Sequence, residues 1–144
     1  MGTITDENQR ALSISSSYEE AELSGMDMLK FSEELSNLIN SKDISIQNIV
    51  DTTGLSKSYI NKLRNLKQAT VQPSRSVILN IALALDASLS ETNSLLKAAR
   101  YQELYARDTA ESVIIWGMLH NLTGTEIRTK LSDMGIGTDI LRQE

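Results

Sequence analysis

The stretch from residue 45 to residue 63 most constrains the fold, because two short helical patterns meet there on either side of one glycine. Ser45 is a favourable N-cap for a helix that must end at Gly54, the residue best able to adopt a positive φ after a helix. Ser56 follows as a second N-cap candidate. Tyr59 and the apolar residues after it mark the inner side of the second helix. The stretch therefore predicts two short helices joined by a tight turn, with a polar and basic side of the second helix facing outward.

Helical spacing of apolar residues continues through the rest of the chain, and no stretch shows convincing strand alternation. The spacing predicts five further helices, which begin at or near Met28, Ser74, Ser90, Asp108 or Thr109, and Thr123 or Thr125. The fourth of the seven helices, counted from Met28, is expected to follow the only proline and to run to about Asp86. The fold class is therefore expected to be all-α.

The 144 residues suffice for one ordinary domain and an appendage. Residues 1–25 are rich in serine and acidic side chains and carry little apolar periodicity, so we expect a disordered acidic arm there. No apolar run approaches the length of a membrane span, and the N-terminus lacks a signal-peptide pattern. We expect a cytoplasmic protein without a membrane partner.

Charge is distributed unevenly along the chain. The formal net charge is −5, yet the stretch from Thr52 to Leu85 carries five basic residues and no acid. Residues 1–27 carry six acids and one base. A basic surface is what phosphate binding requires. The phosphates of DNA are one ligand that such a basic stretch suits. The opposite charges lead to the hypothesis that the acidic arm lies against the basic stretch and competes with DNA for it.

Residues 45–63 resemble the helix-turn-helix of the Cro and phage-repressor family, also called the XRE or Cro/C1-type family. The resemblance rests on the turn residues Gly54 and Leu55 and on the apolar Ile49, Ile60 and Leu63. It continues into the run Ile-Leu-Asn-Ile-Ala-Leu-Ala-Leu at residues 78–85 and covers about residues 28–98. The resemblance implies a five-helix Cro/phage-repressor-like domain at residues 26–100, followed by a C-terminal helical extension at residues 101–144.

The resemblance also implies a sequence-specific DNA-binding transcriptional regulator, expected to be a repressor, that inserts the helix from Ser56 to Leu66 into the major groove of an operator in double-stranded DNA. Lys57, Ser58 and Asn61 are expected to read bases, because their side chains suit guanine, either base or phosphate, and adenine edges respectively. Tyr59 is either a base contact or part of the core. The remaining expected contacts, mainly to phosphates, are Gln47, Ser56, Lys62, Lys67 and Arg75.

The chain departs from the family pattern at the end of the second helix. The family often has an acid there, paired with an arginine of the first helix, and then a glycine, whereas this chain has Arg64 and Leu66. The first helix offers Ile39 on its side of that contact. We expect Arg64 to pair with an acid of the first helix such as Glu34.

The C-terminal extension contains a run from Val113 to Leu119 that is apolar nearly all round apart from its glycine. Such a helix is wrapped by its own chain or buried against a partner. Because operators of this kind are commonly paired half-sites, we expect a homodimer. Its interface is expected to contain Val113, Ile115, Trp116 and Leu119. The alternatives are that residues 106–141 pack back on the first bundle with Trp116 in the core, or that they bind a different protein.

Catalytic and metal-binding patterns are weak. The chain has no cysteine and a single histidine, His120, which is expected to cap a helix end or lie on the surface. We expect no metal, no cofactor and no enzymatic activity. The alternative to DNA binding is an adaptor or antitoxin-like protein that uses the same helices, with Tyr59 and the C-terminal apolar helix presented to a protein partner.

Overall fold

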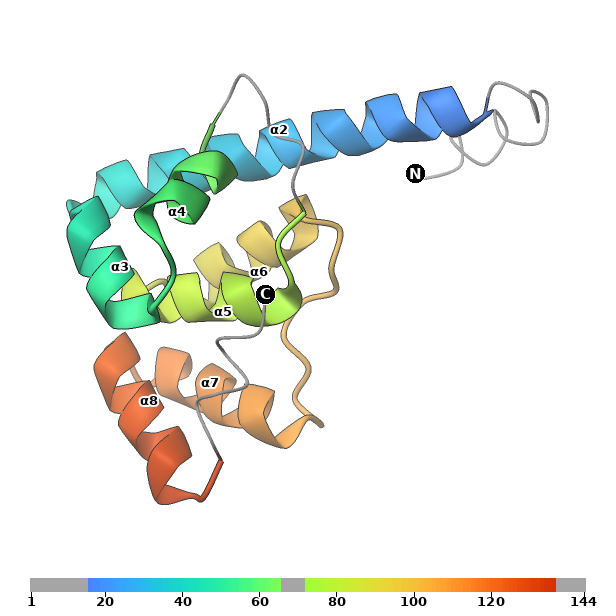
Figure 1. Ribbon diagram of the computed structural model, residues 1–144. Coiled ribbons are helices and arrows are strands. Elements are labelled where there is room, and N and C mark those ends of the chain that lie inside the picture. The colour runs from blue at the N-terminus through green and yellow to red at the C-terminus, as the bar shows by residue number, and fades with distance from the viewer. Residues whose placement is uncertain (1–15, 66–71, 137–144) are drawn as a thin grey trace.

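The computed structural model describes residues 16–65 and 72–136 of the chain (Figure 1). These residues form seven α-helices and no strand, which confirms the all-α class for the part of the chain that the structure describes. The helices are α2 (Ser16–Lys42), α3 (Ile46–Thr53), α4 (Lys57–Leu63), α5 (Arg75–Ala84), α6 (Leu89–Ala98), α7 (Thr109–Leu119) and α8 (Gly124–Asp133).

The first described helix, α2, begins earlier than the sequence pattern suggests. It starts at Ser16 rather than near Met28, so residues 16–25, which we expected within a disordered arm, are helical. The run Glu-Glu-Ala-Glu-Leu at residues 19–23 of this segment consists of residue types that favour helix. Figure 1 shows the N-terminal part of α2 extending beyond the other helices.

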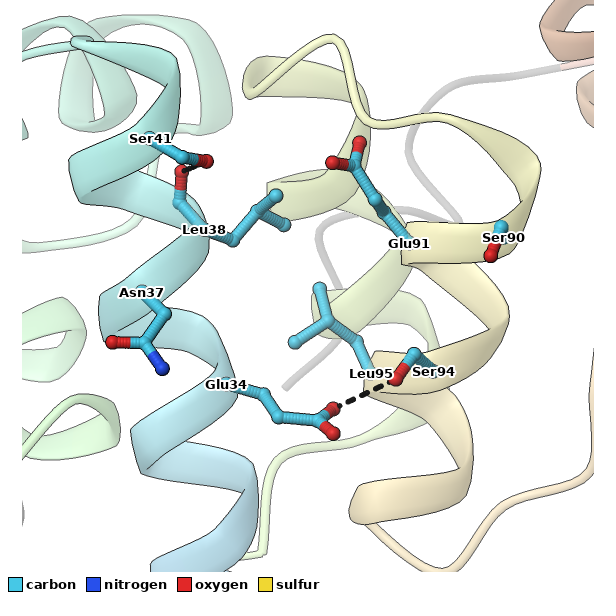
Figure 2. A pocket seen from close by; sticks show the side chains of 8 residues that line it. All are labelled: Glu34, Asn37, Leu38, Ser41, Ser90, Glu91, Ser94 and Leu95. Carbon is cyan, nitrogen blue, oxygen red and sulfur yellow. Dashed lines mark hydrogen bonds between the residues drawn. The ribbon is translucent and has the colours of Figure 1, made fainter.

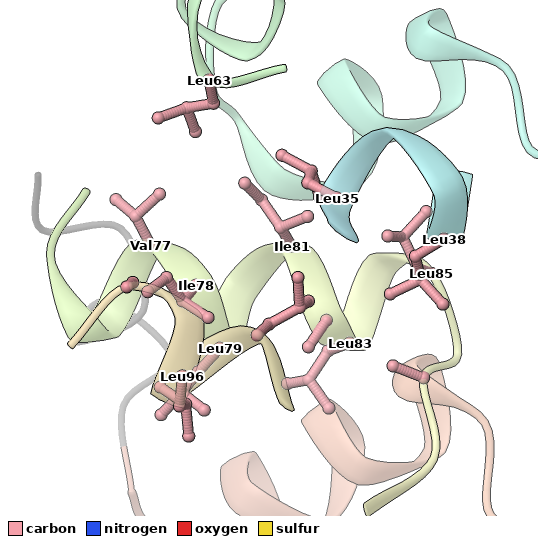
Figure 3. Packing of buried hydrophobic residues seen from close by; sticks show 14 of the residues in the cluster. Leu35, Leu38, Leu63, Val77, Ile78, Leu79, Ile81, Leu83, Leu85 and Leu96 are labelled. Carbon is pink, nitrogen blue, oxygen red and sulfur yellow. The ribbon is translucent and has the colours of Figure 1, made fainter. Parts of the chain in front are cut away.

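The centre of the bundle is α5, whose residues from Val77 to Leu83 are all buried. It packs against α3, α6 and α8, while α2 lies along α6. Figure 3 shows Ile81 of α5 pointing toward Leu35 of α2, with Leu83 pointing the opposite way, toward the C-terminal helices. A helix that is apolar all round requires such a central position.

Most of the expected helix starts are confirmed by side-chain caps. The hydroxyl or carboxylate of each N-cap residue accepts a hydrogen bond from the main-chain N–H three residues later, at Ser45, Ser56, Ser74, Asp108 and Thr123. The exception is α6, which is capped by Ser88 and not by Ser90. The carboxylate of Glu91, three residues after Ser88, accepts a 2.8 Å hydrogen bond from the main-chain N–H of Ser88, so this reciprocal pair fixes the start.

The C-terminal helices belong to the same core as the rest of the chain. α8 packs on α5 and on α7, and α7 also contacts α6. A Cβ added at Gly124, the first residue of α8, would overlap the carbonyl oxygen of Leu83 at the end of α5. The main-chain N–H of Gly124 donates a 2.7 Å hydrogen bond to Oδ1 of Asp86. The two helices therefore meet at a distance that only glycine permits.

Candidate nucleic-acid-binding surface

The turn between α3 and α4 has the geometry that the sequence predicted. Gly54 adopts a φ of 77° and its N–H donates to the carbonyl of Val50, which ends α3. Ser56 is extended, and its hydroxyl accepts a 3.1 Å bond from the N–H of Tyr59, which starts α4. Local caps on both sides of a short turn therefore set the boundaries of the two helices.

The second helix of this pair, α4, has one buried side and one exposed side. Ile60 and Leu63 are buried in the core, and Tyr59 is half-buried against it. The residues expected to contact DNA are exposed, and they are Ser56, Lys57, Ser58, Asn61 and Lys62. The helical spacing alone predicted this division correctly. The exposed side contains hydroxyl, amide and ammonium groups and no carboxylate.

Serines of α2 hold the carboxyl-terminal end of α4. The hydroxyl of Ser32 donates a 2.6 Å hydrogen bond to the carbonyl of Leu63, and the hydroxyl of Ser36 donates a 3.1 Å bond to the carbonyl of Arg64. These two serines stand one turn apart on α2, and Ser32 is buried. They satisfy carbonyls that a helix end leaves without intrahelical partners.

Sequence reasoning missed these serines, although Ser32 follows Phe31 directly and lies four residues before Ser36, at the edge of the apolar stripe. The ion pair that we expected between Arg64 and Glu34 is wrong. Glu34 accepts a 3.0 Å bond from Ser94 of α6, and none of the ion pairs among the described residues joins it to Arg64.

The amino-terminal approach to α4 is held by Thr53, the last residue of α3. Its hydroxyl donates to the carbonyl of Ile49 at 2.7 Å and accepts from the N–H of Leu55 at 3.1 Å. Its carbonyl accepts a 3.0 Å bond from Nδ2 of Asn80, a side chain of α5 with 0% exposure. A single asparagine inside the apolar α5 was the available sequence signal for this contact.

The remaining expected DNA contacts fall in different places. Gln47 is exposed on α3, where its amide donates a 2.9 Å bond to Asp51. Lys67 lies outside the described residues. The guanidinium of Arg75 is bonded to other residues of the chain, so Arg75 is not part of the DNA-binding surface proposed below.

The guanidinium of Arg75 makes a bidentate ion pair with Glu111, at 2.7 Å and 2.8 Å, and donates to the carbonyls of Gln102 and Glu103. Burial raises the pKa of Glu111, but hydrogen bonds from Arg75 and from the N–H of Tyr105 outweigh burial, so the pKa is lowered overall. This network joins the start of α5 to the connector before α7 and to α7 itself.

The residues expected at a dimer or partner interface separate into two groups. Val113 is buried in the chain's own core, and Ile115 is half-buried. Trp116 and Leu119 are exposed by 44% and 63%. One alternative was that the C-terminal helices pack on the first bundle with Trp116 in the core. α7 does pack on the bundle, but Trp116 is exposed and is not part of the core.

The exposed indole of Trp116 lies close to His120 and Lys130. The ring of His120 lies 4.4 Å from it between centroids, and Nζ of Lys130 lies 5.4 Å from its centroid. His120 is the C-cap residue of α7, and its Nδ1 is 2.7 Å from the carbonyl of Trp116. The expectation that His120 caps a helix end is confirmed.

A groove of about 420 Å³ separates α2 from α6 (Figure 2). Its apolar floor is formed by Leu38 and Leu95, and serines, an asparagine and two glutamates surround it. One glutamate, Glu34, accepts from Ser94, and the other, Glu91, forms a 2.9 Å ion pair with Lys42 of α2. All lining residues belong to α2 and α6 or the start of α6, so the groove is separate from the exposed side of α4.

Comparisons of the chain with protein-family models, with curated proteins and with solved structures found no match. Within residues 16–65 and 72–136, no group of three or more His, Cys, Asp or Glu side chains is placed to hold a metal ion. None of the helices in that part of the chain has the length and apolar character that crossing a membrane requires. Function is therefore inferred from the surface residues themselves.

Proposed function

We propose that this chain is a sequence-specific DNA-binding transcriptional regulator that acts by occupying an operator. In this proposal α3 and α4 form a helix-turn-helix, α2 to α6 form a Cro/phage-repressor-like unit, and α4 enters the major groove. The observation that carries the proposal is the two-sided character of α4. Its inner side is fixed by Ile60, Leu63 and the bond from Ser32, while its outer side presents only polar and basic groups.

The exposed residues of α4 match the chemistry of a base-reading helix. Lys57 and Asn61 stand four residues apart, so they lie on one side of the helix. A lysine donates to the O6 and N7 acceptors of guanine, and an asparagine pairs with the N6 and N7 edge of adenine. Ser58 suits a base or a phosphate, and Lys62 suits a phosphate. Gln47 on α3 adds an exposed amide on the neighbouring helix.

Exposed apolar residues at the C-terminal helices support a homodimer as part of the proposal. Trp116 and Leu119 are large, exposed and close together on α7. A two-fold pair of chains would cover them and would present two copies of α4 to paired half-sites about one helical turn apart. Val113 has no place in such an interface because it is already buried.

Selection from a random duplex pool, followed by fluorescence anisotropy from about 50 to 200 mM salt, tests DNA binding. We expect enrichment of a paired motif and affinity that falls steeply with salt. The Lys57→Ala/Lys62→Ala variant should lose this binding. The matched control is Lys30→Ala/Lys97→Ala, which removes the same charge from exposed positions on α2 and α6 and should retain it.

Failure of the folded wild-type chain to enrich any duplex, or equal binding by the two double variants, would refute the proposal. The adaptor or antitoxin-like function would then be the hypothesis to test. For that function the exposed Trp116 and Leu119 are the first residues to substitute in a search for a protein partner.

A further inference from the structure

A polar chain of three residues joins the C-terminal helices to the turn before α4. Arg128 of α8 donates through Nη2 to Oδ1 of Asn80 at 2.6 Å and to the main-chain oxygen of Asn80 at 2.9 Å. Asn80 in turn donates through Nδ2 to the carbonyl of Thr53 at 3.0 Å. Thr53 immediately precedes Gly54 and stands three residues before Ser56, the N-cap of α4. Three segments far apart in the sequence therefore meet at one buried amide.

The guanidinium of Arg128 determines which way the Asn80 amide points. A guanidinium only donates hydrogen bonds and a carbonyl only accepts them. The amide oxygen must therefore face Arg128, which leaves the amide NH2 facing Thr53. Without Arg128, this orientation loses a charge-assisted bond, and the buried amide oxygen loses a donor. The carbonyl of Thr53 then depends on a side chain that is no longer held.

α8 is itself fixed in position, so Arg128 acts from a rigid support. Gly124 stands four residues before Arg128 and thus on the same side of α8. Its N–H is bonded to Asp86 at the end of α5, and its Cα lies against the carbonyl of Leu83. Ile127 and Leu131 are buried in the core. The part of α8 that carries Arg128 is therefore held by contacts before and after this residue along the helix.

We propose that Arg128 is a positioning residue for the DNA-reading helix, acting through Asn80 and Thr53 to set the turn from which α4 starts. The C-terminal helices are then a working part of the reading unit in addition to any role in assembly. This inference rests on the proposed DNA-binding function. It concerns a residue that lies on α8, outside the helix that reads the bases.

The test is amide hydrogen exchange by NMR together with DNA affinity, in the full chain carrying Arg128→Met. The amide of Leu55 reports on the turn, because it donates to Thr53, and the amide of Leu96 in α6 reports on the core. We expect exchange at Leu55 to speed up by about tenfold more than exchange at Leu96, and the Kd for operator DNA to rise about tenfold. A purely structural role would change both amides by the same factor.

Arg107→Met is the matched control, because it makes the same substitution at an exposed arginine of the connector before α7 and should change neither reading. Should Arg128→Met not fold, Arg128→Lys is the second variant, because it keeps the charge but not the guanidinium geometry. Amide exchange at Leu55 should again speed up more than exchange at Leu96, by a smaller factor than in Arg128→Met. Equal exchange factors at Leu55 and Leu96 with unchanged Kd would overturn the inference. If wild-type protein binds no DNA, the proposed function fails, while the exchange ratio still decides whether Arg128 positions the turn.

Discussion

The hydroxyl of Ser32 donates a 2.6 Å hydrogen bond to the main-chain oxygen of Leu63, so a buried side chain of α2 fixes the last turn of α4. At the other end of α4, the turn is fixed through Thr53 by the buried amide of Asn80. The helix that we propose to read DNA is thus held at both ends by polar groups embedded in an apolar core. Such bonds are costly to lose, because a buried carbonyl without a donor retains its desolvation penalty.

Replacing Ser32 by alanine should therefore destabilise the protein and loosen α4. We expect the free energy of unfolding to fall by about 1–3 kcal/mol, since the carbonyl of Leu63 loses its donor. Urea denaturation followed by circular dichroism measures this loss. Ser90→Ala, at an exposed position of α6, is the control and should leave stability nearly unchanged. Equal stabilities of the two variants would contradict the capping role of Ser32.

Substitution of Gly124 by alanine should undo the contact between α8 and α5. The new Cβ would overlap the carbonyl of Leu83, which is backbone and cannot turn away, so we expect a loss of about 3 kcal/mol or more in the free energy of unfolding. Gly135→Ala is a suitable comparison, because Gly135 has a φ of 76° but open space around it. Its cost should be about 1–2 kcal/mol from backbone strain alone. Thermal unfolding of both variants should rank them in that order, and the reverse order would argue against the close approach.

The ion pair between Arg75 and Glu111 should make stability depend on pH in the acidic range. The pKa of Glu111 in the folded chain lies below its ordinary value of 4.5, so its contribution is complete above about pH 4.5 and is lost as the pH falls through the folded value. Glu111→Gln should be less stable than wild type at pH 7. The gap between the two should narrow as the pH drops below about 4.5.

Denaturation curves taken from pH 7 to pH 3 measure this convergence. Glu33→Gln, an exposed change on α2, serves as the control for loss of one carboxylate. A gap between wild type and Glu111→Gln that stays constant over the whole range would show that the charge of Glu111 does not stabilise the fold.

Assembly should depend on the exposed apolar residues of α7. We expect Trp116→Ala/Leu119→Ser to raise the dimer dissociation constant by about tenfold or more, because large exposed aromatic and aliphatic side chains dominate interface energies. Sedimentation equilibrium measures the constant. Trp116 is the only tryptophan of the chain, so its intrinsic fluorescence follows the same surface directly. Tyr105→Ser, which removes another exposed aromatic, is the control. A wild-type chain that stays monomeric at high concentration would rule out this interface.

Features set by neighbours in the sequence were predictable. The caps at Ser45 and Ser56 and the turn at Gly54 each depend on groups within four residues, so the pattern of residue types determines them. The outward side of α4 follows from helical periodicity for the same reason. The cap at Ser88 was also available from the sequence, through the spacing to Glu91.

Features set by distant contacts were not predictable from the pattern. Arg75 stands at a helix start, as a phosphate-binding residue would, yet its partner Glu111 lies 36 residues further along the chain. Arg128 and Asn80 are 48 residues apart. A lone asparagine inside the apolar α5 signals a buried polar contact, but no local spacing identifies Arg128 as its partner. Packing between helices decides that Lys57 is exposed to solvent while Arg75 is bonded to another part of the chain.

The close contact between Gly124 and the carbonyl of Leu83 limits how far the chain can be shortened at its C-terminal end. A fragment ending at residue 100 would contain α2 to α6, the part that the sequence pattern delimits as a domain. Such a fragment would uncover the inner side of α5 that α8 covers and would remove the guanidinium that orients Asn80. The smallest excisable piece that keeps this arrangement therefore extends through α8, to Asp133 at least.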